Sequence, residues 1–213
     1  WLFIVSMGLT LTYGVMKILN LAHGSFYALG AYAAASAVGA YFAGHYPAAG
    51  SFLLLILAGI VVGGSAGLIV ERGLLRPMYG RDEVVLVLVT YAAFLVFEDL
   101  IKLVWGVDPY FAYQPYELLG RVSIGGIGFA AYDLGLFALA IVIGVAAWWA
   151  LERTRSGKLL LAVIHAREIS TAMGINVARM FTATFVIGAI LGALGGAITA
   201  PAISVVPGIG VDV

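Results

Sequence analysis

Cysteine is absent from the 213 residues, and only 10% of them are charged. Without thiols there are no disulfides, thiolate metal sites or cysteine nucleophiles. Soluble domains carry about 25% charged residues, so the low charge excludes a soluble globular enzyme. It also excludes a polar disordered segment and a basic nucleic-acid-binding protein. Acidic and basic residues balance at 11 each, so no net charge attracts a partner of one sign.

Catalytic and metal-binding patterns are also missing. The three histidines, His23, His45 and His165, form neither a His-x-x-x-His pair nor a metal-ligand spacing. There is no Walker-type glycine loop and no G-x-S-x-G nucleophile motif. We therefore predict no metal site, no cofactor held by this chain and no enzymatic activity. An intramembrane enzyme is disfavoured for the same reason.

Apolar residues dominate what is present, at 63% of the chain and a mean hydropathy of +1.08. Six apolar segments have lengths that suit helices crossing a hydrocarbon core of about 30 Å. We predict an all-α polytopic membrane helix bundle of about six transmembrane helices, forming one domain over residues 1–213. Because the chain starts at Trp1 within a short apolar run, we expect a fragment clipped at both ends. The predicted spans lie near 1–17, 24–43, 51–70, 84–105, 133–151 and 181–201.

Basic residues set the expected orientation. Segments 71–83 and 152–180 together hold eight Lys and Arg residues, whereas the opposite loops hold only Arg121. The positive-inside rule places these two segments in the cytoplasm. It also places the link 17–23 inside.

The outer loop 106–132 contains four tyrosines and several Pro and Gly residues. Tyrosine suits the headgroup level of a membrane, so we expect a short hairpin there. This loop is also the largest outer surface available to a partner.

Glycine is abundant, with 28 residues, roughly twice the average usage of about 7%. Two sets recur at every fourth position of predicted spans, which lets helix backbones approach closely. We predict helix packing at these positions, and their opposite directions hint at an inverted repeat. The predicted packing glycines are Gly59, Gly63, Gly67, Gly188, Gly192 and Gly196.

Polar residues interrupt the apolar pattern at two places. In "NLAHGS", Asn20 and His23 lie between two spans. They indicate either a broken helix beside a substrate path or a cytoplasmic turn capped by Asn20. In "FEDLIK", Glu98 and Lys102 lie one helical turn apart, which favours a structural ion pair. Because ionisable residues in membranes are functional candidates, Glu98 stays a substrate-path candidate with Asn20 and His23.

The inner loop 152–180 is longer than a simple connection needs. Residues 159–173 are predicted to form a helix that Gly174 ends. Asn176 is predicted to cap a second helix that begins at Val177 and runs into the sixth span. A short amphipathic helix at this place suits a groove on another protein. The alternative is a membrane-surface helix held by anionic lipid.

At this loop the chain resembles the permease subunits of ABC importers of the branched-chain amino-acid type. "GLTLTYGVMKILNLAHGSFYALGAY" at 8–32 is similar to the first-span signature of that family, and "ERGLLRPMYGR" at 71–81 to its first inner loop. "LVWGVDP" at 103–109 is similar to its fourth-span exit, and "RTRSGKLLLAVIHAREISTAMGIN" at 153–176 to its coupling loop. The four segments occur in the family's order and on a matching topology.

The resemblance implies a coupling helix that docks into an ATP-binding subunit. The family pattern Glu-Ala-Ala-x-x-x-Gly is matched by the spacing of Glu168 and Gly174, while Ile169 and Ser170 replace the two alanines. By position the resemblance makes Glu168, Ala172 and Gly174 the docking core. His165 and Arg167 then lie at its edge.

The resemblance also implies the partners. ATP and Mg would be bound by ATP-binding subunits, beside a second permease, related or identical, and an external solute-binding protein. The chain would be a multi-pass protein of a prokaryotic cell membrane, in contact with lipid and not with nucleic acid. Family substrates are mostly Leu, Ile and Val, and relatives carry other amino acids, amides or urea. The alternative is a stand-alone secondary transporter or channel, which needs no ATPase-docking loop at 159–176.

Overall fold

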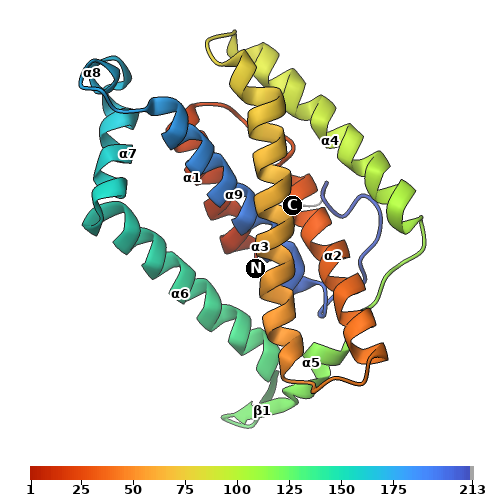
Figure 1. The fold of residues 1–213 in the computed structure, drawn as a ribbon. Coiled ribbons are helices and arrows are strands. Elements are labelled where there is room, and N and C mark those ends of the chain that lie inside the picture. Colours follow the sequence, from red (N-terminus) through yellow and green to blue (C-terminus); the bar gives the residue numbers. More distant parts are fainter. Residues whose placement is uncertain (212–213) are drawn as a thin grey trace.

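The computed structural model describes residues 1–211 as a bundle of long helices running between two ends (Figure 1). Within this range, five helices are long and apolar enough to cross a membrane, and α1 is shorter. The expected all-α membrane bundle is confirmed, with one span reduced to 15 residues. The long elements are α1 (Leu2–Met16), α2 (His23–Ala43), α3 (Gly50–Val70), α4 (Glu83–Trp105), α6 (Ala131–Arg153) and α9 (Val177–Thr199).

Shorter elements connect these helices. A π-helical turn and a 3-10 turn continue α3 as far as Met78. The loop between α4 and α6 contains the expected hairpin, in which Arg121 pairs with Ala130 and Ile124 with Ile127. The short elements are the turns Glu71–Leu75 and Arg76–Met78, α5 (Gln114–Leu118), β1 (Arg121–Ile124), β2 (Ile127–Ala130), α7 (Arg155–His165) and α8 (Arg167–Ala172).

Polar caps and glycines mark the helix boundaries. The Asp82 side chain accepts a hydrogen bond from the Val84 amide at 2.9 Å where α4 begins. Gly106 ends the same helix with φ of 82°. Asn176 caps α9 by accepting from the Arg179 amide at 2.9 Å, as the sequence predicted. Such local signals explain why the predicted span limits agree with the helices to within a few residues.

Helix α9 lies at the centre of the bundle and packs against α1, α2 and α3. The predicted glycines bring these backbones together: a Cβ at Gly63 would lie 2.7 Å from the Ala189 carbonyl oxygen, and one at Gly196 would meet the Tyr27 backbone. The two glycine sets face different partners. The set on α3 faces α9, whereas the set on α9 faces α1 and α2.

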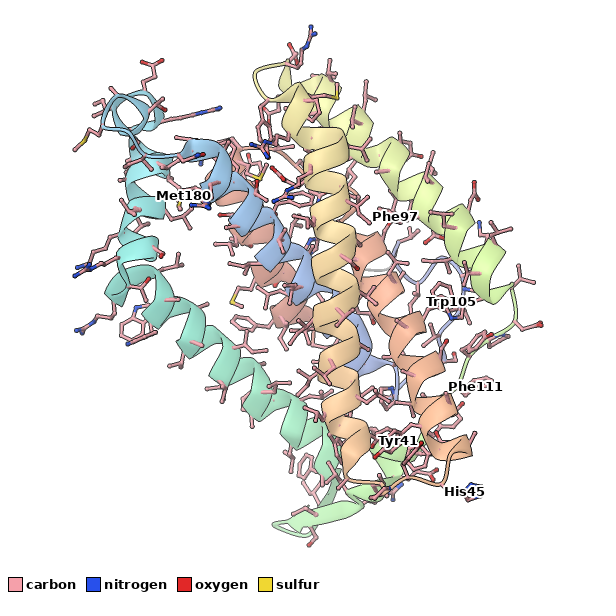
Figure 2. The ribbon with its side chains drawn as sticks, viewed as in Figure 1. Tyr41, His45, Phe97, Trp105, Phe111 and Met180 are labelled. Atoms are coloured by element: carbon pink, nitrogen blue, oxygen red, sulfur yellow. The ribbon has the colours of Figure 1, made fainter. Side chains whose placement is uncertain are left out.

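The arginine-rich segment 71–83 and the helix α8 of the segment 152–180 lie at the same end of the bundle, and α7 leads up to α8 from a junction with α6 nearer mid-height (Figure 1). We call this end of the bundle the arginine-rich end. The loops 44–50 and 106–132 lie at the opposite end, with Tyr41 and His45 close to the first of them (Figure 2). Helix α6 leans away from the other long helices, and Tyr132 is its one buried residue.

Candidate functional site

The link between α1 and α2 returns into the bundle as extended chain. The ring Nε2 of His23 donates a hydrogen bond to the Val5 carbonyl at 3.0 Å, so α2 begins level with Val5. Val5 lies eleven residues before the end of α1 at Met16, about 16 Å along a helix axis. Only the start of the link, at Lys17, therefore lies at the arginine-rich end. The expectation that the whole link 17–23 lies in the cytoplasm is wrong.

A side chain on α4 satisfies the backbone of this extended segment. Thr90 Oγ1 donates to the Leu19 carbonyl at 3.3 Å and accepts from the Leu21 amide at 3.2 Å. Thr90 is itself fully buried. Non-helical backbone at membrane depth is tolerated where protein groups pair with it or a cavity adjoins it. Of the two interpretations of "NLAHGS", the structure therefore supports the broken helix.

A second non-helical segment, residues 200–211, enters from the opposite end. Val205 exchanges two backbone hydrogen bonds of 2.9 Å with Tyr110, just beyond α4. Farther along, Gly210 packs against Gly24, where a Cβ on Gly24 would lie 3.0 Å from the Gly210 carbonyl carbon. Two broken segments thus meet inside the bundle at a pair of glycines.

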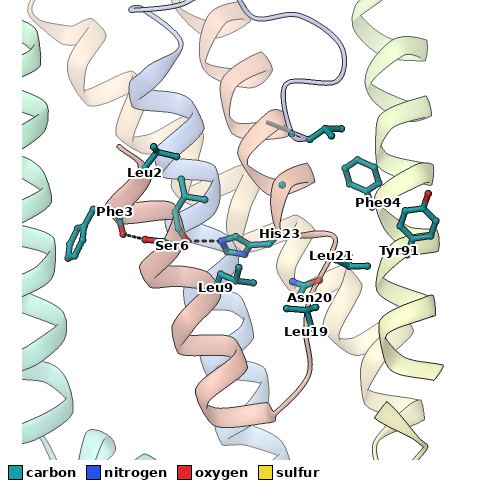
Figure 3. A pocket seen from close by; sticks show the side chains of 14 residues that line it. Leu2, Phe3, Ser6, Leu9, Leu19, Asn20, Leu21, His23, Tyr91 and Phe94 are labelled. Atoms are coloured by element: carbon teal, nitrogen blue, oxygen red, sulfur yellow. Dashed lines mark hydrogen bonds between the residues drawn. The ribbon is translucent and has the colours of Figure 1, made fainter. Parts of the chain in front are cut away.

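A cavity of about 500 Å³ lies where these segments meet, and Figure 3 shows its lining. Helix α1, the extended link, the start of α2, and α4 all contribute to it. Its size falls within the range of about 300–1,000 Å³ usual for small-molecule sites. Its lining is mostly apolar, with the side chains of Asn20 and His23 as buried polar exceptions. Leu2, Phe3, Val5, Ser6, Leu9, Leu19, Leu21, Gly24, Tyr91, Phe94, Gly210 and Val211 complete the lining.

Both buried polar side chains keep hydrogen-bonding capacity at the cavity. Asn20 Oδ1 accepts from the Ala22 amide at 3.1 Å, whereas its Nδ2 has no partner among the described residues. His23 uses Nε2 on Val5, and its Nδ1 has no partner within the same range. The neutral ring then has an acceptor at Nδ1, and Asn20 has a donor at Nδ2. Both atoms are buried behind the cavity surface, so the cavity combines an apolar lining with one donor and one acceptor in its wall.

Glu98 does not form the predicted pair with Lys102. Lys102 Nζ instead lies 3.8 Å from Asp99, and both of these side chains are exposed. Glu98 is buried on α4 and interacts electrostatically with Tyr32 of α2. It points into the helix packing while Lys102 reaches outward, which explains why the pair does not form. Glu98 does not line the cavity that contains Asn20 and His23.

Aromatic rings surround Tyr32 near this carboxylate. Trp105 lies between α4 and α2 (Figure 2), and its Nε1 donates to Ser36 Oγ at 2.6 Å. The Tyr32 ring centroid lies 5.5 Å from that of Trp105 and 5.9 Å from that of Tyr110. These contacts join α2 to α4 on the hairpin side of the cavity.

At the arginine-rich end, the single helix expected over 159–173 is two helices. Helix α7 ends at His165, Ala166 is non-helical, and α8 follows. The break lets α8 pack back on α9, because the Arg167 guanidinium lies 4.9 Å above the Phe181 ring and Ser170 is buried. Gly174 ends this segment with φ of 82°, as predicted. We call residues 165–174 the α8 unit.

The predicted docking residues lie together on this unit. His165, Arg167, Glu168, Ala172 and Gly174 are all exposed around α8, which projects from the bundle (Figure 1). Ile169 and Met173, which sequence reasoning did not select, are 63% and 77% exposed. Two protruding apolar side chains beside a carboxylate form a surface suited to a protein groove.

A buried carboxylate missed by the sequence reasoning joins the first inner loop to α9. Glu71 has no exposed surface, and its Oε1 accepts from Tyr79 and Thr182 hydroxyls, both at 2.8 Å. Burial and the hydrogen bond to Glu71 raise the pKa of Tyr79, so its hydroxyl stays a donor. The available signal was a carboxylate directly after the apolar run that ends at Val70. Among residues 1–211, no group of three His, Asp or Glu side chains could hold a metal.

Membrane-length helices with two broken segments around a cavity are typical of polytopic membrane proteins of the transporter class. Residues 1–213 match the family model described as branched-chain amino acid transport system / permease component. The chain belongs to this family, which confirms the resemblance. It is therefore a multi-pass permease component of a bacterial transporter family and not an enzyme.

Curated relatives are similar over different parts of the chain. The high-affinity branched-chain amino acid transport system permease protein BraD of Pseudomonas aeruginosa is 24% identical over 97% of this chain and 69% of its own length. The corresponding protein LivH of Escherichia coli is 24% identical over 91% of this chain and 64% of its own length. The nucleoside ABC transporter permease protein NupC of Lactococcus lactis is 39% identical over 43% of this chain and 29% of its length. No solved structure matches.

Proposed function

We propose that this chain is a permease subunit of an ATP-driven importer and docks an ATP-binding subunit through α8. The exposed α8 unit at the arginine-rich end carries the proposal. Ile169 and Met173 expose apolar surface to water, which is unfavourable unless a partner covers it. Glu168 supplies a charge beside them. The positive-inside rule places this end in the cytoplasm, where ATP is available.

The attachment of α8 to the bundle suits a coupling element. Arg167 stacks on Phe181 near the start of α9, and buried Ser170, three residues further on, lies on the same face of the short helix. Helix α9 then runs without a break to Gly192, where a Cβ would lie 3.2 Å from the His23 ring. A movement of α8 would thus reach the cavity wall through one continuous helix.

The cavity supports a small, partly apolar substrate. Asn20 Nδ2 would donate to a carboxylate, and His23 Nδ1 would accept from an ammonium group, while leucine and aromatic side chains cover an apolar group. Branched-chain amino acids have this combination of groups. The relatives BraD and LivH, named for branched-chain amino acid transport, support the same substrate class. Glu98 remains a candidate for a separate part of the path.

The proposal requires several partners. ATP and Mg would be bound by ATP-binding subunits at the arginine-rich end. A second permease, related or identical, would complete the path, and the loop 106–132 would receive an external solute-binding protein. The alternative function, a stand-alone secondary transporter or channel, would use the same cavity without a partner on α8.

Crosslinking at α8 tests the proposal directly. Because residues 1–213 lack cysteine, Thr171→Cys introduces the single thiol of this segment at an exposed position of α8. We expect this variant, in the full-length protein in membranes, to crosslink to a co-expressed ATP-binding subunit in a manner that ATP changes. The matched control, Ser123→Cys, places the thiol on β1 at the opposite end and should give no crosslink. A freely labelled Thr171→Cys thiol without any crosslink would favour the stand-alone transporter.

Reversing the charge at Glu168 should weaken the same contact. We expect Glu168→Arg to reduce co-purification of the ATP-binding subunit at least about tenfold, equivalent to about 1.4 kcal/mol. Glu152→Arg is the control, because Glu152 is also an exposed carboxylate and lies at the end of α6. Both variants should insert normally. Equal binding by the two variants would remove Glu168 from the proposed docking surface.

A further inference from the structure

Three arginines gather at one pocket of the arginine-rich end. Arg72 and Arg76 lie one helical turn apart after α3, and Arg179 lies in the first turn of α9. Together with Asn176 they line a hollow of about 530 Å³. None of the three guanidinium groups has a hydrogen bond or an ion pair within residues 1–211, where the one ion pair joins Lys102 to Asp99.

The adjacent carboxylate does not pair with these arginines. Glu71 precedes Arg72 in the sequence, but its Oε1 accepts from the Tyr79 and Thr182 hydroxyls, and its Oε2 is buried without a partner among residues 1–211. The pocket therefore presents three arginines beside one buried carboxylate, and none of the three is ion-paired within the described residues. Arginine guanidinium groups match phosphate oxygens through paired, charge-assisted hydrogen bonds.

Apart from Thr182, whose hydroxyl is bonded to Glu71, the rest of the lining is apolar and runs toward the middle of the bundle. Ala183 and Val186 follow Arg179 at four and seven residues along α9, so the three share one helix face. Ala183 is exposed and Val186 half-buried. The hollow is thus charged at the membrane boundary and apolar one to two turns deeper. This gradient matches a phospholipid, with its phosphate at the boundary and its acyl chain along the helix.

We propose that this pocket binds an anionic phospholipid of the cytoplasmic leaflet. The phosphate is held by Arg72, Arg76 and Arg179, and an acyl chain lies against Ala183 and Val186. Free phosphate would engage the arginines but leave the apolar wall uncovered. A bound lipid would hold the first inner loop against α9, beside the Glu71 hydrogen bonds that already join them. The lipid composition of the membrane would then affect α9, the helix that connects α8 to the cavity.

Native mass spectrometry of the purified full-length protein tests this site. Delipidated protein is titrated with phosphatidylglycerol and, separately, with phosphatidylcholine. We expect preferential retention of phosphatidylglycerol, and a loss of about tenfold in its affinity for Arg72→Gln/Arg179→Gln, because two guanidinium–phosphate contacts disappear. The matched control is Arg153→Gln/Arg155→Gln, which removes the same charge from exposed positions at the junction of α6 and α7, outside the pocket. The control should retain the lipid as the wild type does.

Other results would overturn the proposal. Equal lipid loss in the two double variants, or equal retention of the two lipids by the wild type, would show non-specific attraction. If inorganic phosphate displaces phosphatidylglycerol and stabilises the protein against heat as much as the lipid does, the pocket is a site for free anions. If Arg72→Gln/Arg179→Gln binds lipid normally but no longer binds the ATP-binding subunit, the arginines belong to a protein interface. If the Gln variant does not fold, Arg72→Lys/Arg179→Lys replaces it and should bind with intermediate affinity.

Discussion

Gly30→Val is expected to prevent normal packing of α2 against α9 and to give the largest loss of stability of any single change considered. A Cβ at Gly30 would lie 2.7 Å from the Ala193 carbonyl carbon and Cα. These are backbone atoms, so no rotamer change relieves the collision and the helices must separate. Overpacking commonly costs about 1–3 kcal/mol, and we expect the upper end, a fall in Tm of about 10 °C. Thermal unfolding followed by size-exclusion chromatography measures it.

The same helix supplies the matched control. A Cβ at Gly39 of α2 would meet nothing within 4 Å, and Gly39 is exposed. Gly39→Val therefore makes the same chemical change in the same helix without a collision, and its Tm should remain near that of the wild type. Similar Tm losses for the two variants would mean that intrinsic helix effects, and not the approach of α2 to α9, determine the result.

Asn20→Leu is expected to reduce uptake at least about tenfold without loss of assembly. The substitution removes the Nδ2 donor at the cavity and the Oδ1 acceptor that holds the Ala22 amide at 3.1 Å. Losing one buried hydrogen-bonding group costs about 1–3 kcal/mol, and each 1.4 kcal/mol changes affinity about tenfold. The measurement is uptake of radiolabelled leucine by proteoliposomes that contain the full transporter.

Ser6→Ala is the control for this second prediction. Ser6 also lines the cavity, but its hydroxyl already donates to the Phe3 carbonyl at 3.1 Å, so its loss leaves the cavity's free polar atoms unchanged (Figure 3). Uptake by Ser6→Ala should stay close to that of the wild type. If Asn20→Leu also transports normally while assembling fully, Asn20 has a structural role only and the cavity is not the path.

The span limits could be predicted because their signals are local. Apolar runs of membrane length are bounded by Asp82, Gly106 and Asn176, each of which acts on its own helix end. Gly174 likewise ended the α8 unit as expected because its φ of 82° suits glycine. Such features depend on a few neighbouring residues, so a single sequence contains them.

The candidate site depended on contacts that a single sequence does not display. The path of the link after Lys17 is stabilised by Thr90, which lies 69 residues from Leu21 in the chain. The break at Ala166 follows from packing of Arg167 on Phe181. Glu98 was expected to pair with Lys102 from spacing alone, but burial separates the two side chains. Asn20 and His23 were selected as substrate-path candidates because polar side chains between two spans are rare, and both line the cavity.

The unbroken course of α9 has a mechanical consequence. From Val177 to Gly192 the helix extends about 22 Å, with α8 attached near one end and the His23 ring against the other. If α9 tilts as a rigid body by about 5° at its α8 end, this length displaces Gly192 by about 2 Å. A Cβ at Gly192 would lie 3.2 Å from the His23 ring, so the absence of a side chain leaves room for the imidazole beside α9. A larger residue at Gly192 would press on the imidazole, and the position of α9 and the position of this cavity side chain would then depend on each other.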